Sequence, residues 1–283
     1  MREKRKKEDL SRKVENKKLV FTVYILLRVA VIATMVSQAM AGNWENVYTC
    51  LLALVLFFVP SLIEHRLHID LPDALEIIVL LFIFAAEIMG EVEEYYLKVT
   101  FWDDMLHTLN GFLFAAVGFS IVNLLNRDRH VGFALSPFYM ALTAFCFSMT
   151  IGVLWEFFEW GVDTFLHSDM QKDTVLQAIH SVSLHPEGRN IPVTAGDIRD
   201  VILIHSDGSA QALGLGGYLD IGLIDTMTDL FVNFIGATVF SVIGYFYVKT
   251  KGKGKLANQL IPVVMEETTG AEQEDNGGDD PAV

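Results

Sequence analysis

Six long apolar runs divide this chain and constrain its fold more than any other feature. Each run holds roughly the 20 residues that an α-helix needs to cross a hydrocarbon core about 30 Å thick. Hydrophobic residues make up 52% of the chain, and they gather in these runs instead of alternating with charged residues. The pattern predicts an all-α polytopic membrane protein with six transmembrane helices: Leu19–Ala41, Trp44–Leu62, Ala74–Tyr96, Met105–Leu125, Phe138–Trp160 and Leu230–Val248.

Basic residues at the ends of the runs orient the predicted bundle. Nine Lys and Arg residues precede the first run, Arg66 lies between the second and third, two Arg residues lie between the fourth and fifth, and four Lys residues follow the sixth. Cytoplasmic loops of membrane proteins carry such an excess of positive charge, so both termini are expected in the cytoplasm. The tryptophans then lie near the outer membrane boundary, as an aromatic belt would: Trp44, Trp102, Trp155 and Trp160.

Charge and hydropathy divide the chain into five segments. The loop between the fifth and sixth runs is expected to form a small extracytoplasmic cap, with a short helix at Met170–Ser181 and a hairpin turn at Asp207-Gly208. Its expected strands are Ile191–Ala195, Val201–His205 and Ala210–Leu215. The segments are a basic cytoplasmic head (1–18), transmembrane helices 1 to 5 (19–160), the cap (161–224), transmembrane helix 6 (225–250) and an acidic, disordered cytoplasmic tail (251–283).

Neither charged end is typical of a nucleic-acid-binding protein. The basic head directly precedes a transmembrane run, where it serves as a topology signal. The expected partners are therefore the lipid bilayer and, as an option that the sequence leaves open, further copies of the same chain.

Acidic and amide side chains recur at helical spacing in the outward-facing ends of these runs. Asp225, Asp229 and Asn233 stand at i, i+4 and i+8, and each such set shares one face of its helix. Ionisable groups in membrane segments are costly, and they usually face a partner, a cavity or an ion. We therefore expect a polar site at the outer ends of the helices, drawn from Glu87, Glu91, Asp103, Asp104, His107, Glu156, Glu159, Asp163, Asp225, Asp229 and Asn233.

A divalent metal is the cofactor that these residue types favour, although its presence and identity stay open. Carboxylates joined by one imidazole suit Mn, Fe or Zn. Glu156 and Glu159 are the candidate catalytic residues, and Gln171 and Asp173 would add ligands or position a substrate. The candidate metal ligands are Asp103, Asp104, His107, Asp225 and Asp229.

A structural interpretation competes with the metal site. Asp103, Asp104 and Asp225 stand where carboxylates cap helix starts. Arg28 lies about ten residues into the first run, near the bilayer centre, and requires a counter-charge there. Glu87 is at a compatible depth, so it is a candidate for that pairing as well as for the site.

Four polar signatures carry a family resemblance: WDDMLHTLNGF at Trp102–Phe112, WEFFEWGVD at Trp155–Asp163, DMQKDT at Asp169–Thr174 and GYLDIGLIDTMTDLFVNFIGA at Gly217–Ala237. Taken in this order, the sequence resembles the YjdF-type bacterial inner-membrane proteins. The resemblance covers the chain from the third run to the sixth. It implies a protein of the bacterial cytoplasmic membrane with about six spans, and it supplies no reaction.

Three functions are compatible with these observations. The first is a metal-dependent hydrolase or transferase that acts on a lipid or headgroup substrate from the outer side. The second is a cation or proton transporter or channel that uses the acidic residues as binding sites. The third is a structural or partner-binding membrane protein without catalysis, whose polar residues only bridge helices.

Overall fold

The computed structural model describes residues 2–67, 69–127, 135–251, 260–261 and 263–264. The acidic tail, for which the sequence predicts disorder, lies almost entirely outside these residues. So do the side chains of most of the basic head.

The described chain is mostly helical. Five of its helical stretches are long and apolar enough to cross a membrane, and they coincide with five of the six expected spans. These candidate spans are Lys17–Ala41, Trp44–Arg66, Trp102–Asn123, Pro137–Leu166 and Leu223–Lys249.

The third expected span is built differently from the others. Helix α4 (Asp73–Ile83) continues without a break into a π-helical segment, η1 (Phe84–Val92). Backbone at the junction stays helical at Ile83 and Phe84. The short helix α5 (Tyr95–Lys98) follows, and Tyr96 packs its ring against Gly90, where a Cβ atom would lie within 2.4 Å of it. π-Helical turns inside α-helices occur frequently at functional sites.

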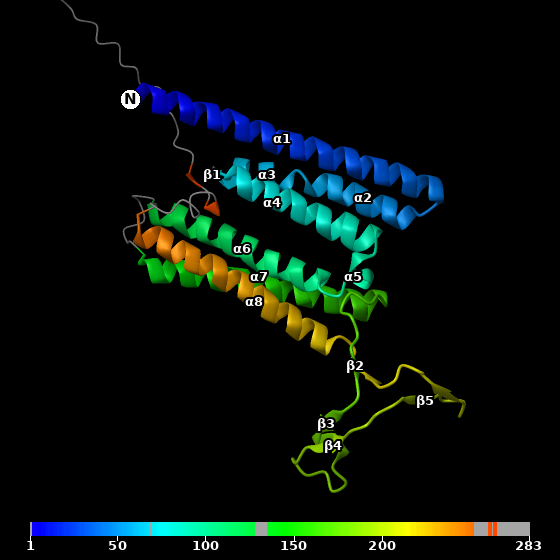
Figure 1. Ribbon diagram of the computed structural model, residues 1–283. Helices are drawn as coiled ribbons and strands as arrows, with labels where there is room; N and C mark the ends of the chain where they lie inside the picture. The colour runs from blue at the N-terminus through cyan, green and yellow to red at the C-terminus, as the bar shows by residue number, and fades with distance from the viewer. Residues whose placement is uncertain (1, 68, 128–134, 252–259, 262, 265–283) are drawn as a thin grey trace, which may run out of the picture.

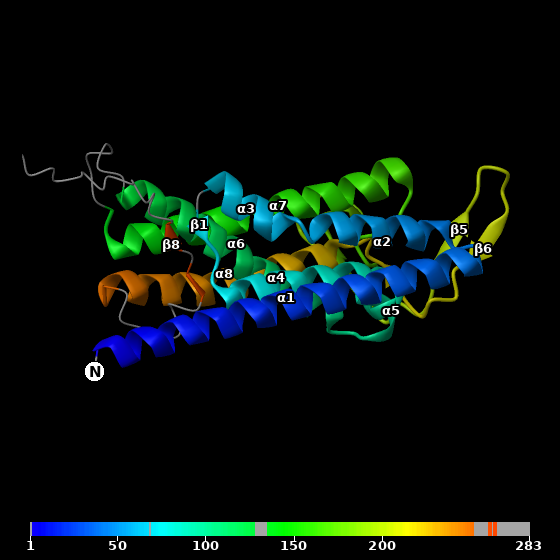
Figure 2. The ribbon, with the colours of Figure 1, turned by 90° about the horizontal axis from the view of Figure 1, so that it is seen from above.

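The helices form two groups that lie side by side along their length (Figures 1 and 2). One group holds α1 (Arg2–Ala41), α2 (Trp44–Leu56), α4 and η1, and it encloses a small core around Val31 and Cys50. The other group holds α6 (Trp102–Arg127), α7 (Pro137–Leu166) and α8 (Leu223–Lys249). A core around Phe119 and Phe240 fills this second group and reaches α4 at Leu75.

Helices α6 and α8 approach each other closely through glycine. A Cβ atom on Gly236 would lie 1.9 Å from the backbone oxygen of Thr108, and one on Gly111 would lie 2.2 Å from that of Asn233. Helix α7 joins the pair when the buried Ser148 hydroxyl donates a hydrogen bond of 2.6 Å to the Gly111 carbonyl oxygen. Small residues with an interhelical hydrogen bond are typical of packing between membrane helices.

Short elements complete the described chain. Helix α3 (Val59–Leu67) continues the line of α2 after a turn, and the other elements are strands in two-stranded antiparallel sheets and one 3₁₀ turn. The sheets pair β1 (Ile69–Asp70) with β8 (Val263–Val264), β2 (Val175–Leu176) with β7 (Tyr218–Leu219), β3 (Ile179–Ser181) with β4 (Val193–Ala195), and β5 (Ile202–Ile204) with β6 (Ala210–Ala212); the turn η2 is Val182–Leu184.

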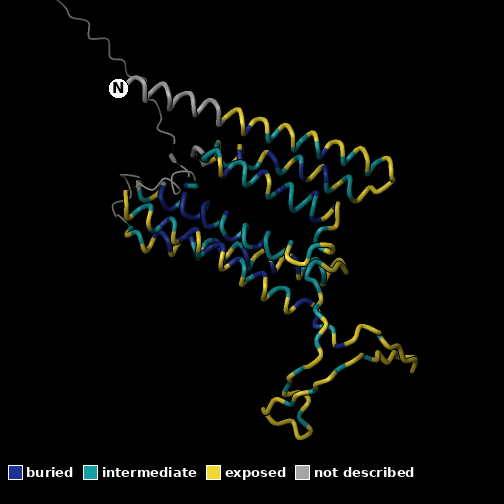
Figure 3. The backbone as a smooth tube through the Cα atoms, viewed as in Figure 1, coloured by how far each residue is buried: buried dark blue, intermediate teal, exposed yellow. Residues whose placement is uncertain are grey.

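The loop between α7 and α8 leaves the end of the bundle as extended hairpins that are largely exposed (Figures 1 and 3). The expected strands are present as β4, β5 and β6, and the Asp207-Gly208 turn joins β5 to β6 with Gly208 at φ +83°. The expected helix at Met170–Ser181 is wrong. Carboxylates take its backbone N–H groups instead, since Asp163 binds those of Met170 and Gln171 and Asp220 binds that of Thr174.

Candidate functional site

Three helix ends meet at the end of the bundle from which strand β2 leaves (Figure 1), and β7 pairs with β2 there. Helices α6 and α8 begin there and α7 ends there, so their polar faces converge at a common depth. His107 lies five residues into α6 and Asp229 six residues into α8, which places both about 7–9 Å inside the helix ends.

His107 is at the centre of the first group of polar side chains. Its Nδ1 atom lies 3.8 Å from Oε1 of Glu156, and its Nε2 atom lies 3.9 Å from Oδ2 of Asp229. Glu159 completes the group, and each residue offers a ligand atom within 4.8 Å of the others. This separation allows a single metal ion to bind all four residues after small side-chain movements.

A second group shares one member with the first. Asp103, Asp225 and Asp229 also offer carboxylate oxygens within 4.8 Å of one another. Asp103 connects the two groups directly, because its Oδ1 atom is 3.5 Å from His107 Nε2. Asp229 therefore lies between an imidazole-containing group and a group made only of carboxylates.

The first group is buried, and several of its carboxylate oxygens lack hydrogen-bond partners among the described residues. Both oxygens of Glu156, one of Glu159 and Oδ2 of Asp229 have no hydrogen-bond partner in the described part of the chain. Thr226 and Gln171 lie close to Glu156 but do not reach hydrogen-bonding geometry with its oxygens. Buried carboxylates normally have partners, and leaving them unpaired costs several kcal/mol. The exposed fractions of the group are 7% for His107, 4% for Glu156, 7% for Glu159 and 2% for Asp229.

Neighbouring groups fix the orientation of two carboxylates. The Trp155 indole N–H donates a hydrogen bond of 2.8 Å to Oε1 of Glu159. The backbone N–H of Lys172 donates one of 2.8 Å to Oδ2 of Asp225. The sequence assigned Trp155 only to an aromatic belt, although its spacing of four residues from Glu159 puts both on one helix face.

The remaining expected site residues lie around the two groups. Asp104 belongs to neither of them. Gln171 donates a hydrogen bond of 2.5 Å to the Thr226 hydroxyl and thus connects the loop to α8. Asp163 holds this loop through the Met170 and Gln171 N–H groups. Asp173 lies beside Asp169, and burial together with Asp169, Asp220 and Asp163 raises the pKa of its carboxyl group.

Asn233 connects α8 to α7. It is 1% exposed, its Nδ2 atom lies 3.5 Å from the Met149 sulfur, and its Oδ1 atom has no hydrogen-bond partner among the described residues. Asn233 follows Asp229 by one helical turn on α8, so it marks the inner limit of the polar region.

The sequence left open a pairing between Arg28 and Glu87, and the described residues show a different contact for Arg28. The Arg28 guanidinium lies over the rings of Tyr24 and Phe58, at 4.3 and 4.4 Å from their centroids. Its buried Nε and Nη2 atoms have no hydrogen-bond partner among the residues that the structure describes. Aromatic faces attract cations, and two flanking rings therefore give Arg28 a contact that sequence depth alone could not predict. Glu87 and Glu91 lie on η1 and belong to neither candidate metal group.

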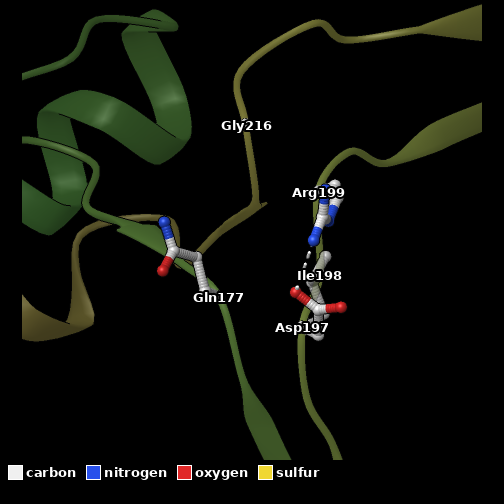
Figure 4. A pocket seen from close by; sticks show the side chains of 5 residues that line it. All are labelled: Gln177, Asp197, Ile198, Arg199 and Gly216. Carbon is white, nitrogen blue, oxygen red and sulfur yellow. Dashed lines mark hydrogen bonds and ion pairs between the residues drawn. The ribbon is translucent and has the colours of Figure 1, made fainter.

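The Lys and Arg side chains of the loop between α7 and α8 each have an acidic neighbour. Arg199 lies 3.4 Å from Asp197 at an open cleft among the hairpins, which Gln177 and Gly216 also line (Figure 4). Arg189 pairs with Glu187, and Lys172 Nζ lies 3.6 Å from Oδ2 of Asp169.

Comparison with known proteins places these features in a family. Residues 19–250 match the family described as "Predicted membrane protein (DUF2238)". The chain belongs to this family. It is also 29% identical over 128 residues to an uncharacterized protein of Thermotoga maritima, a stretch that covers 43% of this chain and 63% of the relative. The aligned stretch thus spans less than two thirds of that relative's length. No solved structure matches the chain. The YjdF-type resemblance fits the family loosely and stays an expectation.

Proposed function

We propose that this membrane protein is a metal-dependent hydrolase or transferase that acts on a lipid-linked or headgroup substrate from the outer side of the membrane. One observation supports this proposal above the others. His107, Glu156, Glu159 and Asp229 are buried together while four of their carboxylate oxygens lack a hydrogen-bond partner in the described chain. A divalent cation would satisfy those oxygens and balance the negative charge.

The residues divide into ligands and a base. His107 and Asp229 would hold the metal, which polarises a phosphoryl or carbonyl oxygen and activates water. Neither oxygen of Glu156 has a hydrogen-bond partner among the described residues, so it is the carboxylate best placed to take a proton from that water. Glu159 is held by Trp155 and would orient the metal or the water.

The membrane arrangement is part of the proposal. Helix α4 with η1 would be a sixth span, because the two form one continuous helix from Asp73 to Val92 beside α2. Both termini would lie in the cytoplasm, which is the side that the Lys and Arg distribution favours. The segment 161–224 would then cover the outer end of the site, in a bacterial cytoplasmic membrane. Association of several copies stays open.

Metal analysis tests the proposal directly. Protein purified in detergent would be stripped with a chelator, dialysed against Mn²⁺ or Zn²⁺, and analysed for bound metal. The wild type should retain stoichiometric metal, whereas His107→Ala and Asp229→Ala should lose most of it. Asp104→Asn is the matched control, because it removes a neighbouring carboxylate that belongs to neither group.

Two assays on the same preparations then distinguish a hydrolase from a transporter. Release of headgroup from lipid phosphate or carboxylic esters in vesicles should require the added metal and fail in Glu156→Gln. The proposal would be contradicted if the wild type bound no metal and its thermal stability did not change on chelation. Cation or proton flux in proteoliposomes that Glu156→Gln abolishes, without any lipid hydrolysis, would identify a transporter instead.

A further inference from the structure

The second group of carboxylates has no role in a site with one metal. Asp103 and Asp225 offer carboxylate oxygens within 4.8 Å of Asp229, yet neither belongs to the group around His107. Together the two groups hold five carboxylates, with a formal charge of −5 when all are ionised. One divalent cation would leave −3 in a region enclosed by three helices, and two would leave −1. Uncompensated charge in such a region is expensive, and a second cation would offset more of it than one does.

Asp229 has the geometry of a shared ligand. Its side chain is 2% exposed, Oδ2 has no hydrogen-bond partner in the described chain, and the residue is a member of both groups. A carboxylate has two oxygens and can bind one cation with each. His107 Nε2 is 3.5 Å from Asp103 Oδ1 and 3.9 Å from Asp229 Oδ2, so the two groups are in contact with each other.

We infer that the site binds two divalent cations, bridged by Asp229. The first cation takes His107 and Asp229, with Glu159 and the base Glu156 beside it, a mixed set that suits Mn, Fe or Zn. The second takes Asp103 and Asp225 with Asp229, an oxygen-only set that suits Mg or Mn. This inference rests on the proposed function and specifies the metal centre of the same site.

Two cations also indicate the class of substrate. A phosphoryl group requires positive charge around its oxygens, and Arg189, Arg199 and Lys172 are paired with acidic neighbours in the loop. Paired metal ions about 3.5–4 Å apart supply that charge and clamp both the attacking and the leaving oxygen. The substrate class is therefore a lipid-linked phosphate ester. Water oxygen bonds to phosphorus while the bond between phosphorus and the lipid oxygen breaks. Glu156 takes one proton from the water and passes it to the departing lipid oxygen, which leaves as an alcohol.

Counting manganese on the full-length protein tests the inference. The wild type in detergent should bind two Mn²⁺ per chain and show the electron paramagnetic resonance spectrum of an exchange-coupled pair. Asp225→Asn should bind one and show an uncoupled spectrum, since Asn keeps an oxygen for the Lys172 N–H group but loses the charge. Asp103→Asn is a second variant with the same expectation, and Asp104→Asn should keep both ions.

The outcomes separate the two proposals. One Mn²⁺ in the wild type overturns the paired site and leaves the metal-dependent function standing. No Mn²⁺ overturns both. Inorganic phosphate should alter the coupled spectrum of the wild type at concentrations that leave Asp225→Asn unchanged. An unaltered wild-type spectrum would overturn the phosphate-ester assignment.

Discussion

Replacement of Gly236 by alanine tests how closely the site depends on helix packing. The new Cβ atom would lie 1.9 Å from the Thr108 carbonyl oxygen and 2.9 Å from the Phe112 nitrogen, where ordinary contacts begin at 3.4 Å. Both neighbours are backbone atoms and cannot rotate away. Helices α6 and α8 must therefore separate by about 1.5 Å, which is the difference between 3.4 and 1.9 Å.

The cost of this separation follows from known magnitudes. Overpacking a core costs about 1–3 kcal/mol, and alanine returns up to about 1 kcal/mol of helix propensity. We expect a net loss of about 1–2 kcal/mol, which lowers the melting temperature by several degrees. Asp229 precedes Gly236 by seven residues, about 10 Å along α8, so its distance from His107 should also grow and metal affinity should fall.

Thermal unfolding in detergent, followed by tryptophan fluorescence with and without Mn²⁺, measures both effects. Gly161→Ala is the control, because a Cβ atom there would meet nothing within 4 Å. The control should unfold at or above the wild-type temperature. Equal melting temperatures for Gly236→Ala and Gly161→Ala would refute the close packing of α6 and α8.

Three further substitutions test individual contacts. Trp155→Phe removes the indole donor to Glu159 and should weaken Mn²⁺ binding several-fold in a calorimetric titration, while unchanged affinity would count against an orienting role. Asp220→Ala leaves the Thr174 and Ile224 N–H groups without their acceptor. It should cost about 1–2 kcal/mol of unfolding free energy, detectable by thermal denaturation. Arg28→Leu should change stability by less than about 1 kcal/mol, because the replaced guanidinium has no ion pair in the described chain; a large loss would reveal a hidden partner.

Hydropathy predicted the helices because the membrane requires long apolar helices whatever the details of packing. Helical spacing also predicted that His107, Glu156 and Asp229 share one region, because the ends of α6, α7 and α8 had to lie at the same membrane surface. The structure brings these residues together. The sequence could not predict that a carboxylate such as Asp104 stays outside the groups. That outcome depends on how each helix is rotated about its axis relative to its neighbours, which sequence spacing does not fix.

Other features depended on contacts between distant residues. The π-helical segment η1 has no signature in hydropathy, and it accompanies the close approach of Tyr96 to Gly90. The segment after α7 has the composition of a short helix, but Asp163 and Asp220 capture its backbone N–H groups. Tertiary hydrogen bonds override local propensity in such cases.

A crystal grown with Mn²⁺ and measured at the manganese absorption edge tests the central claim most directly, because it locates the metal by element. The account predicts anomalous density between α6, α7 and α8, at about 2.0–2.6 Å from the ligand atoms of His107 and Asp229. Density elsewhere on the protein, or none at saturating Mn²⁺, would contradict a metal centre at these residues.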